Sequence, residues 1–406
     1  MAKDTHSSCQ CDGQTGECRG PEPLDMLPMY NPAMPAPGAG DDHPCCGPPA
    51  GPPSSEYEKP GYALCDFVAD FLDTPAGPVP RVKTRLAHRD LAGALRVRIG
   101  IRRNDYKIAP GLYAVGSPDK KSPVLVTANY KLSFDHLRRC LCDVDAWLLV
   151  LDTRGINVWC AAGKGTFGTE EIVRRVHINR LAMVVDHRKL ILPQLGAPGV
   201  AAPQVKKRCG FEVVWGPVRA ADLPAFLAAG RITEEGMRRV TFTVSERLVL
   251  VPVELSLSRN MMGWALLAAF IVSGIGPHVF SLSMAWGRGV QAAVACLTGV
   301  LAGCVAVPLF LPWIPGRAFS LKGAATGLVL SSIVVAIMGA GPHPAVWPSV
   351  ALVIFSTAVS SFMAMEFTGA TPFTSPTGVE KEMRRAIPFQ LAAVLIAAGL
   401  WVGAAF

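Results

Sequence analysis

Short apolar runs alternate with amphipathic stretches in the chain between about residue 60 and residue 230. Short runs bounded by polar residues are typical of buried strands, and the stretches between them carry apolar residues at helical spacing. This alternation predicts βαβ units on a largely parallel sheet. The predicted strands are Leu95–Ile101, Val124–Ala128, Ala146–Leu151, Leu181–Val185 and Phe211–Trp215, and the predicted helices are Phe134–Cys142, Glu170–Asn179, Pro203–Lys207 and Asp222–Ala229.

Turn residues and a hairpin pattern complete this region. Gly210 and Gly230 follow predicted helices, at positions where a glycine C-cap is expected. Val240–Val244 and Leu248–Leu255 have the pattern of a β-hairpin. We therefore expect a Rossmann-like α/β domain over residues 61–258.

From residue 259 the apolar segments become long enough to cross about 30 Å of hydrocarbon. The positive-inside rule then places the soluble domain in the cytoplasm, because one side of the segments holds Arg288 alone and the other side holds six basic residues. We expect a multi-pass protein of the cytoplasmic membrane with its C-terminus outside and five transmembrane helices over residues 259–406. The predicted spans are Met262–Met284, Gly289–Leu311, Gly323–Gly341, Ala345–Met365 and Ala386–Phe406.

The predicted spans contain few polar groups that could move an ion. His278 and Glu366 lie near the ends of segments, where a charge costs little. Cys296 and Cys304 are eight residues apart and suit helix packing. Anchoring is therefore the expected role of this region, although transport of a soft metal is an alternative.

Residues 1–60 are rich in Pro, Gly, Ser and Asp, which predicts a disordered tail. The segment has no apolar stretch typical of an export signal, so its cysteines should be reduced. Their spacing does not fit a zinc site and leaves two alternatives open, soft-metal binding or solvent-exposed thiols without a metal function. The residues concerned are Cys9, Cys11, Cys18, His43, Cys45 and Cys46.

Composition adds one exclusion. The 406 residues carry a formal net charge of +8, and half of them are hydrophobic. The charge is mild, and the arginines are scattered rather than gathered into a stripe, so we do not expect a nucleic-acid partner.

The stretch Leu151–Thr169 has the features of a ligand-binding turn. It follows a predicted strand and precedes a predicted helix that Thr169 should cap, and its glycines allow a ligand close to the backbone. The small residues Ala161 and Ala162 should keep the wall beside Cys160 open. A phosphate-binding loop is excluded, since seven residues separate Gly155 from Gly163 and no Ser or Thr follows Lys164.

The eight residues Asn157-Val158-Trp159-Cys160-Ala161-Ala162-Gly163-Lys164 resemble the cap-helix signature of the corrinoid protein of the mercury-methylation pair. That family is related to the corrinoid iron–sulfur protein of the acetyl-CoA pathway. The stretch from Pro123 to Asp135 and the C-terminal apolar block agree with the same family. The resemblance covers roughly residues 111–406.

The resemblance implies a cobalamin-type corrinoid whose cobalt has the Cys160 thiolate as its lower axial ligand. It implies a methyltransferase that passes a methyl group from Cys-ligated methyl-cobalt(III) to Hg(II), forming methylmercury. A thiolate is a strong, soft donor, which favours departure of the methyl group as a carbanion or radical. The expected cofactor-binding residues are Thr127, Asn129, Thr153, Gly155, Asn157, Val158, Trp159, Ala161, Ala162, Gly163, Lys164, Thr166 and Gly196.

Several of these residues also have simpler explanations. Lys164 fits a solvated surface equally well, Thr127 and Asn129 fit a helix or turn cap, and Gly196 fits an ordinary turn. The motif Asp-x-His-x-x-Gly, in which many corrinoid domains supply a histidine ligand, is matched neither at Asp41-x-His43 nor at His187.

The resemblance also implies partners: a ferredoxin-like [4Fe–4S] protein as electron donor, a methyltransferase as methyl donor, and membrane lipid. The chain has no run of four cysteines with cluster spacing, so the clusters should belong to the partner. A methyl carrier of one-carbon metabolism is the alternative function, with the same cofactor and a different acceptor.

Overall fold

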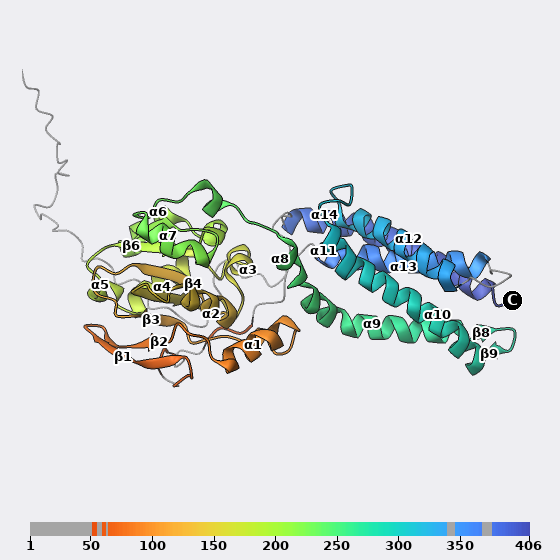
Figure 1. Ribbon diagram of the computed structural model, residues 1–406, viewed down its shortest axis with the longest axis horizontal. Coiled ribbons are helices and arrows are strands. Elements are labelled where there is room, and N and C mark those ends of the chain that lie inside the picture. Colours follow the sequence, from red (N-terminus) through yellow and green to blue (C-terminus); the bar gives the residue numbers. More distant parts are fainter. Residues whose placement is uncertain (1–50, 55–58, 62–63, 339–345, 368–375) are drawn as a thin grey trace, which may run out of the picture. The chain divides into compact units, whose positions relative to one another are not determined.

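The computed structural model describes residues 51–54, 59–61, 64–338, 346–367 and 376–406. It contains a mixed α/β domain followed by a region of five long apolar helices, as the sequence predicts (Figure 1). The cysteines of the N-terminal tail, from Cys9 to Cys46, fall outside the described residues.

A seven-stranded mixed sheet forms the α/β domain. Its strand order is β1-β2-β3-β5-β4-β6-β7. Strands β4, β5, β6 and β7 are mutually parallel, whereas β3 runs antiparallel to β5, and β1 and β2 form an antiparallel pair at one edge. The strands are β1 Val68–Thr74, β2 Gly77–Val82, β3 Gly111–Val115, β4 Val124–Ala128, β5 Ala146–Leu151, β6 Lys189–Leu192 and β7 Glu212–Trp215.

Each face of the sheet has its own hydrophobic core, because successive side chains of a strand point to opposite faces. In β5, Leu149 and Leu151 pack against one face with helices α3 Val158–Gly163, α4 Thr169–Ile178 and α6 Ala202–Cys209. Leu148 and Val150 pack against the other face with α2 Lys131–Cys140 and α7 Leu223–Ala228. Both faces are therefore covered, which explains why β4 and β5 are fully buried apolar runs.

The prediction of the central elements is confirmed. Strands β4 and β5 have the predicted bounds, and β7 and helices α2, α4, α6 and α7 lie within a few residues of their predicted positions. Gly210 is the left-handed C-cap of α6, with φ of 76°, and Gly230 follows α7 with φ of 70°. Helix α4 begins differently, since its N-cap is Gly168 and Thr169 is its first helical residue.

Three other predictions are wrong. Leu95–Ile101 is not a strand, since it overlaps the end of helix α1 His88–Arg98, which buries Val97 and leaves Leu95 exposed. Leu181–Val185 is mostly the short helix α5 Leu181–Val184, which starts after a left-handed Arg180, and the strand comes later as β6. The predicted hairpin at 240–255 is helical, because a capping box between Thr243 and Glu246 starts helix α8 Val244–Leu248.

The C-terminal region contains five helical segments long and apolar enough to span a membrane, among the described residues. The first predicted span runs too far, since helix α9 Val251–Ser273 ends before a small hairpin of β8 Ile275–Gly276 and β9 Val279–Phe280. The remaining helices are α10 Leu282–Leu301, with α11 Val307–Phe310 after it, α12 Phe319–Met338, α13 Val346–Glu366 and α14 Pro376–Gly403.

Small residues let the helices approach α13 closely. A Cβ on Gly323 or Gly327 of α12 would lie 2.5 Å from Ser360 of α13, and one on Gly299 of α10 would lie 2.6 Å from the Ser356 carbonyl. Ser360 in turn donates its hydroxyl proton to the Gly323 carbonyl at 2.7 Å. Cys296 and Cys304 are buried within this packing, as the sequence predicts for small packing residues.

Candidate functional site

The candidate site lies at the carboxyl ends of the parallel strands, where open α/β sheets bind ligands. Strand β5 ends at Leu151, and the chain then turns through Arg154 and Gly155, which both have positive φ values of 55° and 78°. Helix α3 begins directly after this turn at Val158. The predicted strand and the predicted helix on either side of the stretch are confirmed as β5 and α4, whereas α3 lies inside the stretch predicted as a turn.

Asn129, which follows the neighbouring strand β4, holds the turn in place. Its Oδ1 atom accepts hydrogen bonds from the Thr153 amide at 3.1 Å and the Gly155 amide at 3.0 Å, and lies 2.9 Å from the Thr153 hydroxyl. Its Nδ2 atom donates to Asp152 at 3.0 Å. Because Asn129 is fully buried, these bonds replace the water that the turn amides would otherwise bind.

Cys160 lies in the first turn of α3. Asn157 caps this helix, because its Oδ1 atom accepts a hydrogen bond from the Cys160 amide at 2.9 Å. The Cys160 side chain is half-buried against the core of that face, and the adjacent Trp159 is exposed. The helix therefore presents a thiol at the edge of the domain, fixed through its own backbone.

Beside α3 the strand ends form a hollow of about 320 Å³. Its wall on the α3 side is Asn157, Val158 and Trp159, and Thr127 at the end of β4 contributes to the floor. Pro193 and Gly216, which follow β6 and β7, close the opposite side. The hollow is lined mainly by apolar atoms, as is usual for sites that bind organic cofactors.

A 3₁₀ helix, Gln194–Gly199, packs so closely against α3 that a side chain would not fit at Gly196 or Gly199. A Cβ on Gly196 would lie 2.5 Å from the Phe167 ring, and one on Gly199 would lie 2.2 Å from the Phe167 carbonyl oxygen. The same Gly199 position lies 3.0 Å from the Ala162 Cα. These glycines and the small Ala162 therefore set how closely the segment after β6 approaches the helix that carries Cys160.

The predicted site residues fall into four groups around α3. Thr127, Asn157, Val158 and Trp159 line the hollow, whereas Asn129, Thr153 and Gly155 are buried in the turn and bonded to one another. Ala161 and Ala162 lie on the buried side of α3 and pack into the core. The remaining residues, Gly163, Lys164, Thr166 and Gly196, lie at the C-terminal end of α3 or in the segments packed beside it.

Tyr130 is a neighbour of Cys160 that sequence reasoning did not single out. It is the N-cap residue of α2 and is buried. Burial raises the pKa of its phenol, the positive charges of Arg103 and Arg98 oppose this rise, and the Cys160 sulfur adds to it. Its position directly after Asn129 is the signal that could have marked it.

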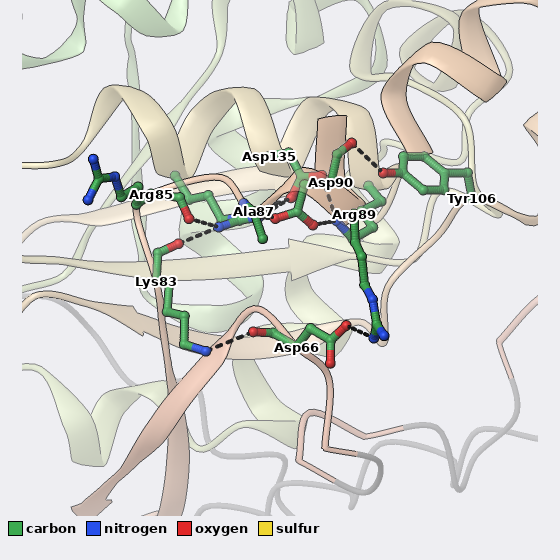
Figure 2. Close-up of polar contacts among 10 residues, drawn as sticks. Asp66, Lys83, Arg85, Ala87, Arg89, Asp90, Tyr106 and Asp135 are labelled. Carbon is green, nitrogen blue, oxygen red and sulfur yellow. Dashed lines mark hydrogen bonds and ion pairs between the residues drawn. The ribbon is translucent and has the colours of Figure 1, made fainter. Parts of the chain in front are cut away.

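A second polar cluster connects helices α1 and α2 on the other face of the sheet (Figure 2). Asp90 binds Lys131 at 2.6 Å and Arg138 at 2.7 Å, and Asp135 binds the same two cations at 2.6 and 2.8 Å. Tyr106 reaches the Asp90 carbonyl at 3.4 Å. Burial alone would raise the pKa of the Asp90 carboxyl, but the hydrogen bonds from Lys131, the Ala87 amide and Arg138 lower it to about 2.

All four charged side chains of this cluster are paired with one another. The cluster therefore links helix α1 to helix α2, and we do not assign it a ligand. Within the described part of the chain, no group of three His, Cys, Asp or Glu side chains is arranged to hold a metal ion. A metal at Cys160 would therefore find fewer than three such ligands among the residues that the structure describes.

The part of the chain that contains the candidate site is similar to known proteins. Residues 101–227 match the family model described as CO dehydrogenase/acetyl-CoA synthase delta subunit. The acetyl-CoA decarbonylase/synthase complex subunit gamma of Methanopyrus kandleri is 34% identical over 140 residues, which is 34% of this chain and 29% of the relative. The corrinoid/iron-sulfur protein large subunit of Moorella thermoacetica is 29% identical over 125 residues, which is 30% of this chain and 28% of that protein.

The chain thus spans under a third of the length of these relatives. The match includes β3 to β7, the turn after β5 and helix α3. Residues 101–227 are thus similar to CO dehydrogenase/acetyl-CoA synthase subunits, and part of the chain is similar to a corrinoid/iron-sulfur protein.

Proposed function

We propose that the protein is a membrane-anchored corrinoid-dependent methyltransferase in which the Cys160 thiolate would bind the cobalt of the cofactor. The observation that carries this proposal is the position of Cys160, half-buried in the first turn of α3 and directly after Asn157, Val158 and Trp159, which line the hollow at the strand ends. Cys160 itself is not among the lining residues and packs against the neighbouring core. The relation of this domain to corrinoid proteins supports the choice of cofactor.

The residues around the hollow fit such a cofactor in their chemistry. A corrin ring supplies its own nitrogen ligands, so one soft protein donor is sufficient at an axial position. Val158 and Trp159 offer apolar surface for the ring, and Thr127 offers a hydroxyl for its polar side chains. Lys164 at the end of α3 is a cation for a carboxylate or phosphate of the cofactor. When bound, the corrinoid supplies a cobalt atom that carries the methyl group.

The chain's own contribution is to fix the thiolate. Asn129 holds the turn, Asn157 caps the helix, and Gly196 and Gly199 bring the neighbouring segment against it. A thiolate donates electron density to the metal more strongly than imidazole does, which favours transfer of a methyl group to an electrophile. On this argument the acceptor is Hg(II), and the product is methylmercury.

The comparisons support a second candidate, a methyl carrier of one-carbon metabolism, because the matching relatives are subunits of acetyl-CoA decarbonylase/synthase complexes. Both candidates need a low-potential reductant to restore the cobalt. We propose a ferredoxin-like [4Fe–4S] protein for this role and a separate methyltransferase as methyl donor. The two candidates differ only in the acceptor.

The test uses the full chain, purified in detergent, loaded with methylcobalamin and supplied with Hg(II). We expect methylmercury from the parent protein and a loss of at least about 100-fold in Cys160→Ala, since loss of a group that merely supports a metal ligand already costs up to about 100-fold. Cys142→Ala is the matched control, because Cys142 is an exposed thiol of the same domain. The absorption spectrum of the bound corrinoid reports the ligand independently of turnover.

Each result decides between the candidates. Bound corrinoid whose spectrum changes in Cys160→Ala, without methylmercury, would favour the one-carbon carrier. An unchanged spectrum in Cys160→Ala would remove the thiolate from the proposal. Failure of the parent protein to bind corrinoid would overturn both candidates.

A further inference from the structure

A long groove lies in the membrane bundle between helices α12 and α14. Both helices pack against α13, so that Ile354, Thr357 and Ser361 of α13 form its floor. Figure 1 shows the three helices side by side along their length. The groove has a volume of about 1190 Å³, which exceeds the usual range of small-molecule pockets, about 300–1,000 Å³.

Most of the groove is apolar. Leu321, Ala324 and Leu328 of α12 line one wall, and Phe389 and Ala393 of α14 line the other. On α14 the wall extends eight residues from Arg385 to Ala393, which corresponds to about 12 Å at 1.5 Å per residue. An extended hydrocarbon chain fits a lining of this length and composition.

One end of the groove is positively charged. Arg317, before α12, and Lys381 and Arg385, in the early part of α14, line it with exposed side chains. None of these three residues forms an ion pair with another residue that the structure describes. The acidic lining residue Glu382 is already engaged, since it accepts a hydrogen bond from the Ser320 amide at 2.6 Å.

Two residues that line the groove carry buried polar atoms. Gln390 is only 9% exposed, and its Nε2 atom donates to Ser361 at 2.9 Å, but its Oε1 atom has no hydrogen-bond partner among the described residues. The same holds for the Thr357 hydroxyl. Both residues belong to the lining of the groove, although the two unpartnered atoms themselves are buried.

We infer that this groove binds one molecule of an anionic phospholipid. Two regions of the groove match two parts of such a lipid. The phosphate meets Arg317, Lys381 and Arg385, and an acyl chain covers the apolar walls.

The positive charge of Arg317, Lys381 and Arg385 favours an anionic lipid over a zwitterionic one. Cations at the membrane surface attract anionic lipids by about 1 kcal/mol each, whereas a zwitterionic lipid presents a compensating positive group to the same cluster. The inference concerns the membrane region alone and does not depend on the proposed function of the α/β domain.

The experiment is native mass spectrometry of the full chain, titrated with phosphatidylglycerol or phosphatidylcholine of matched acyl chains. We expect tighter binding of phosphatidylglycerol, and a loss of roughly 30-fold in the double variant Lys381→Gln/Arg385→Gln. Arg384→Gln is the matched control, since Arg384 is exposed on the same helix, pairs with Glu380 at 2.7 Å and does not line the groove. Helix content by circular dichroism checks that each variant is folded.

A second variant tests the apolar part without changing charge. Ala393→Trp should fill the groove and weaken phosphatidylglycerol binding, while the charged end stays intact. Equal binding of the two lipids, or equal losses in the control and the double variant, would overturn the inference. Displacement of the lipid by inorganic phosphate at millimolar concentration would assign the charged end to free phosphate instead.

Discussion

Asn129 is the residue on which the geometry of the candidate site most depends. A single side-chain amide satisfies the turn amides of Thr153 and Gly155 and also reaches Asp152. The turn contains Arg154, a non-glycine residue with positive φ, and such a conformation persists only when the surrounding structure fixes it. Asn129 provides that restraint from the end of the neighbouring strand.

Replacement of Asn129 should therefore disturb both stability and the site. Asn129→Ala leaves the buried Gly155 amide without a partner, while the Thr153 amide keeps its bond to the Leu151 carbonyl, so we expect a loss of roughly 1–3 kcal/mol in domain stability. Thermal unfolding of the detergent-purified protein and its corrinoid occupancy measure the two effects. Asn157→Ala is the comparison, because it removes only a helix cap and should cost about 1 kcal/mol. Equal losses in the two variants would contradict the role given to Asn129.

At the scale of elements, ionic and steric contacts decide which helices meet. Asp90 brings α1 against α2 through Lys131 and the buried Arg138, and Gly323 and Gly327 bring α12 against α13. Neither contact is visible in the hydrophobic pattern. Asp90 lies in a stretch that the pattern did not mark as helical, and glycine carries no hydropathy signal for its packing partner.

The Asp90 cluster predicts a specific acid sensitivity. The pKa of Asp90 is about 2 in the folded protein, against an ordinary value of 3.8 for the same carboxyl without these contacts. A lowered pKa stabilises the fold above the unfolded value, and this contribution, on the order of 2 kcal/mol, is lost as the pH falls from about 4 to about 2. Asp90→Asn should be less stable at neutral pH and should lose less stability over that interval. Melting temperature against pH measures both, and parallel curves for parent and variant would contradict the prediction.

The glycine contacts predict a strong steric effect in the bundle. Gly327→Leu forces a side chain into Ser360, so we expect α12 to separate from α13 and the melting temperature of the membrane region to fall. Gly399→Ala in α14 is the control, since a Cβ at that position would have no other atom within 4 Å beyond its own helix turn. Near-equal melting temperatures for the two variants would show that the close approach is dispensable.

At the scale of the whole molecule, strands buried on both faces are easier to predict than strands at the edge of the sheet. Strands β4 and β5 were predicted to the residue because both faces of the sheet are covered and every side chain is buried. Strands β1 and β2 were missed, since they form an edge pair with mixed polar positions. Leu95, Val97, Ile99 and Ile101 alternate as in a strand, yet the first two belong to a helix in which Val97 is the buried apolar position.

The candidate site was predictable in part for the same reason. The stretch around Cys160 could be located from its glycines and from the resemblance of eight residues. The contribution of Asn129 depends on partners more than twenty residues away, and that of Gly199 on a segment from another strand end. Such contacts follow from strand order, which the pattern of one strand does not contain.

The orientation of the five helices is the prediction that belongs to the whole chain. With the basic connections in the cytoplasm, the β8–β9 hairpin should face outward and the segment before α12 inward. In intact cells we expect a membrane-impermeant maleimide to label His278→Cys and to leave Pro315→Cys unlabelled until the cells are permeabilised. Both positions are exposed. The reverse labelling pattern would invert the topology.

Helix α3 is only six residues long, and its length affects how long the Cys160 thiol stays in place. A helix of this length has little stability alone, since isolated helices shorter than about 12–15 residues are marginal in water. Helix α3 is stabilised by contacts with Asn129, Asn157 and the glycines packed beside it. The Cys160 thiol therefore keeps its orientation only until these contacts break and α3 opens locally. The hydrogen-exchange rate of the Cys160 amide measures how often this opening occurs.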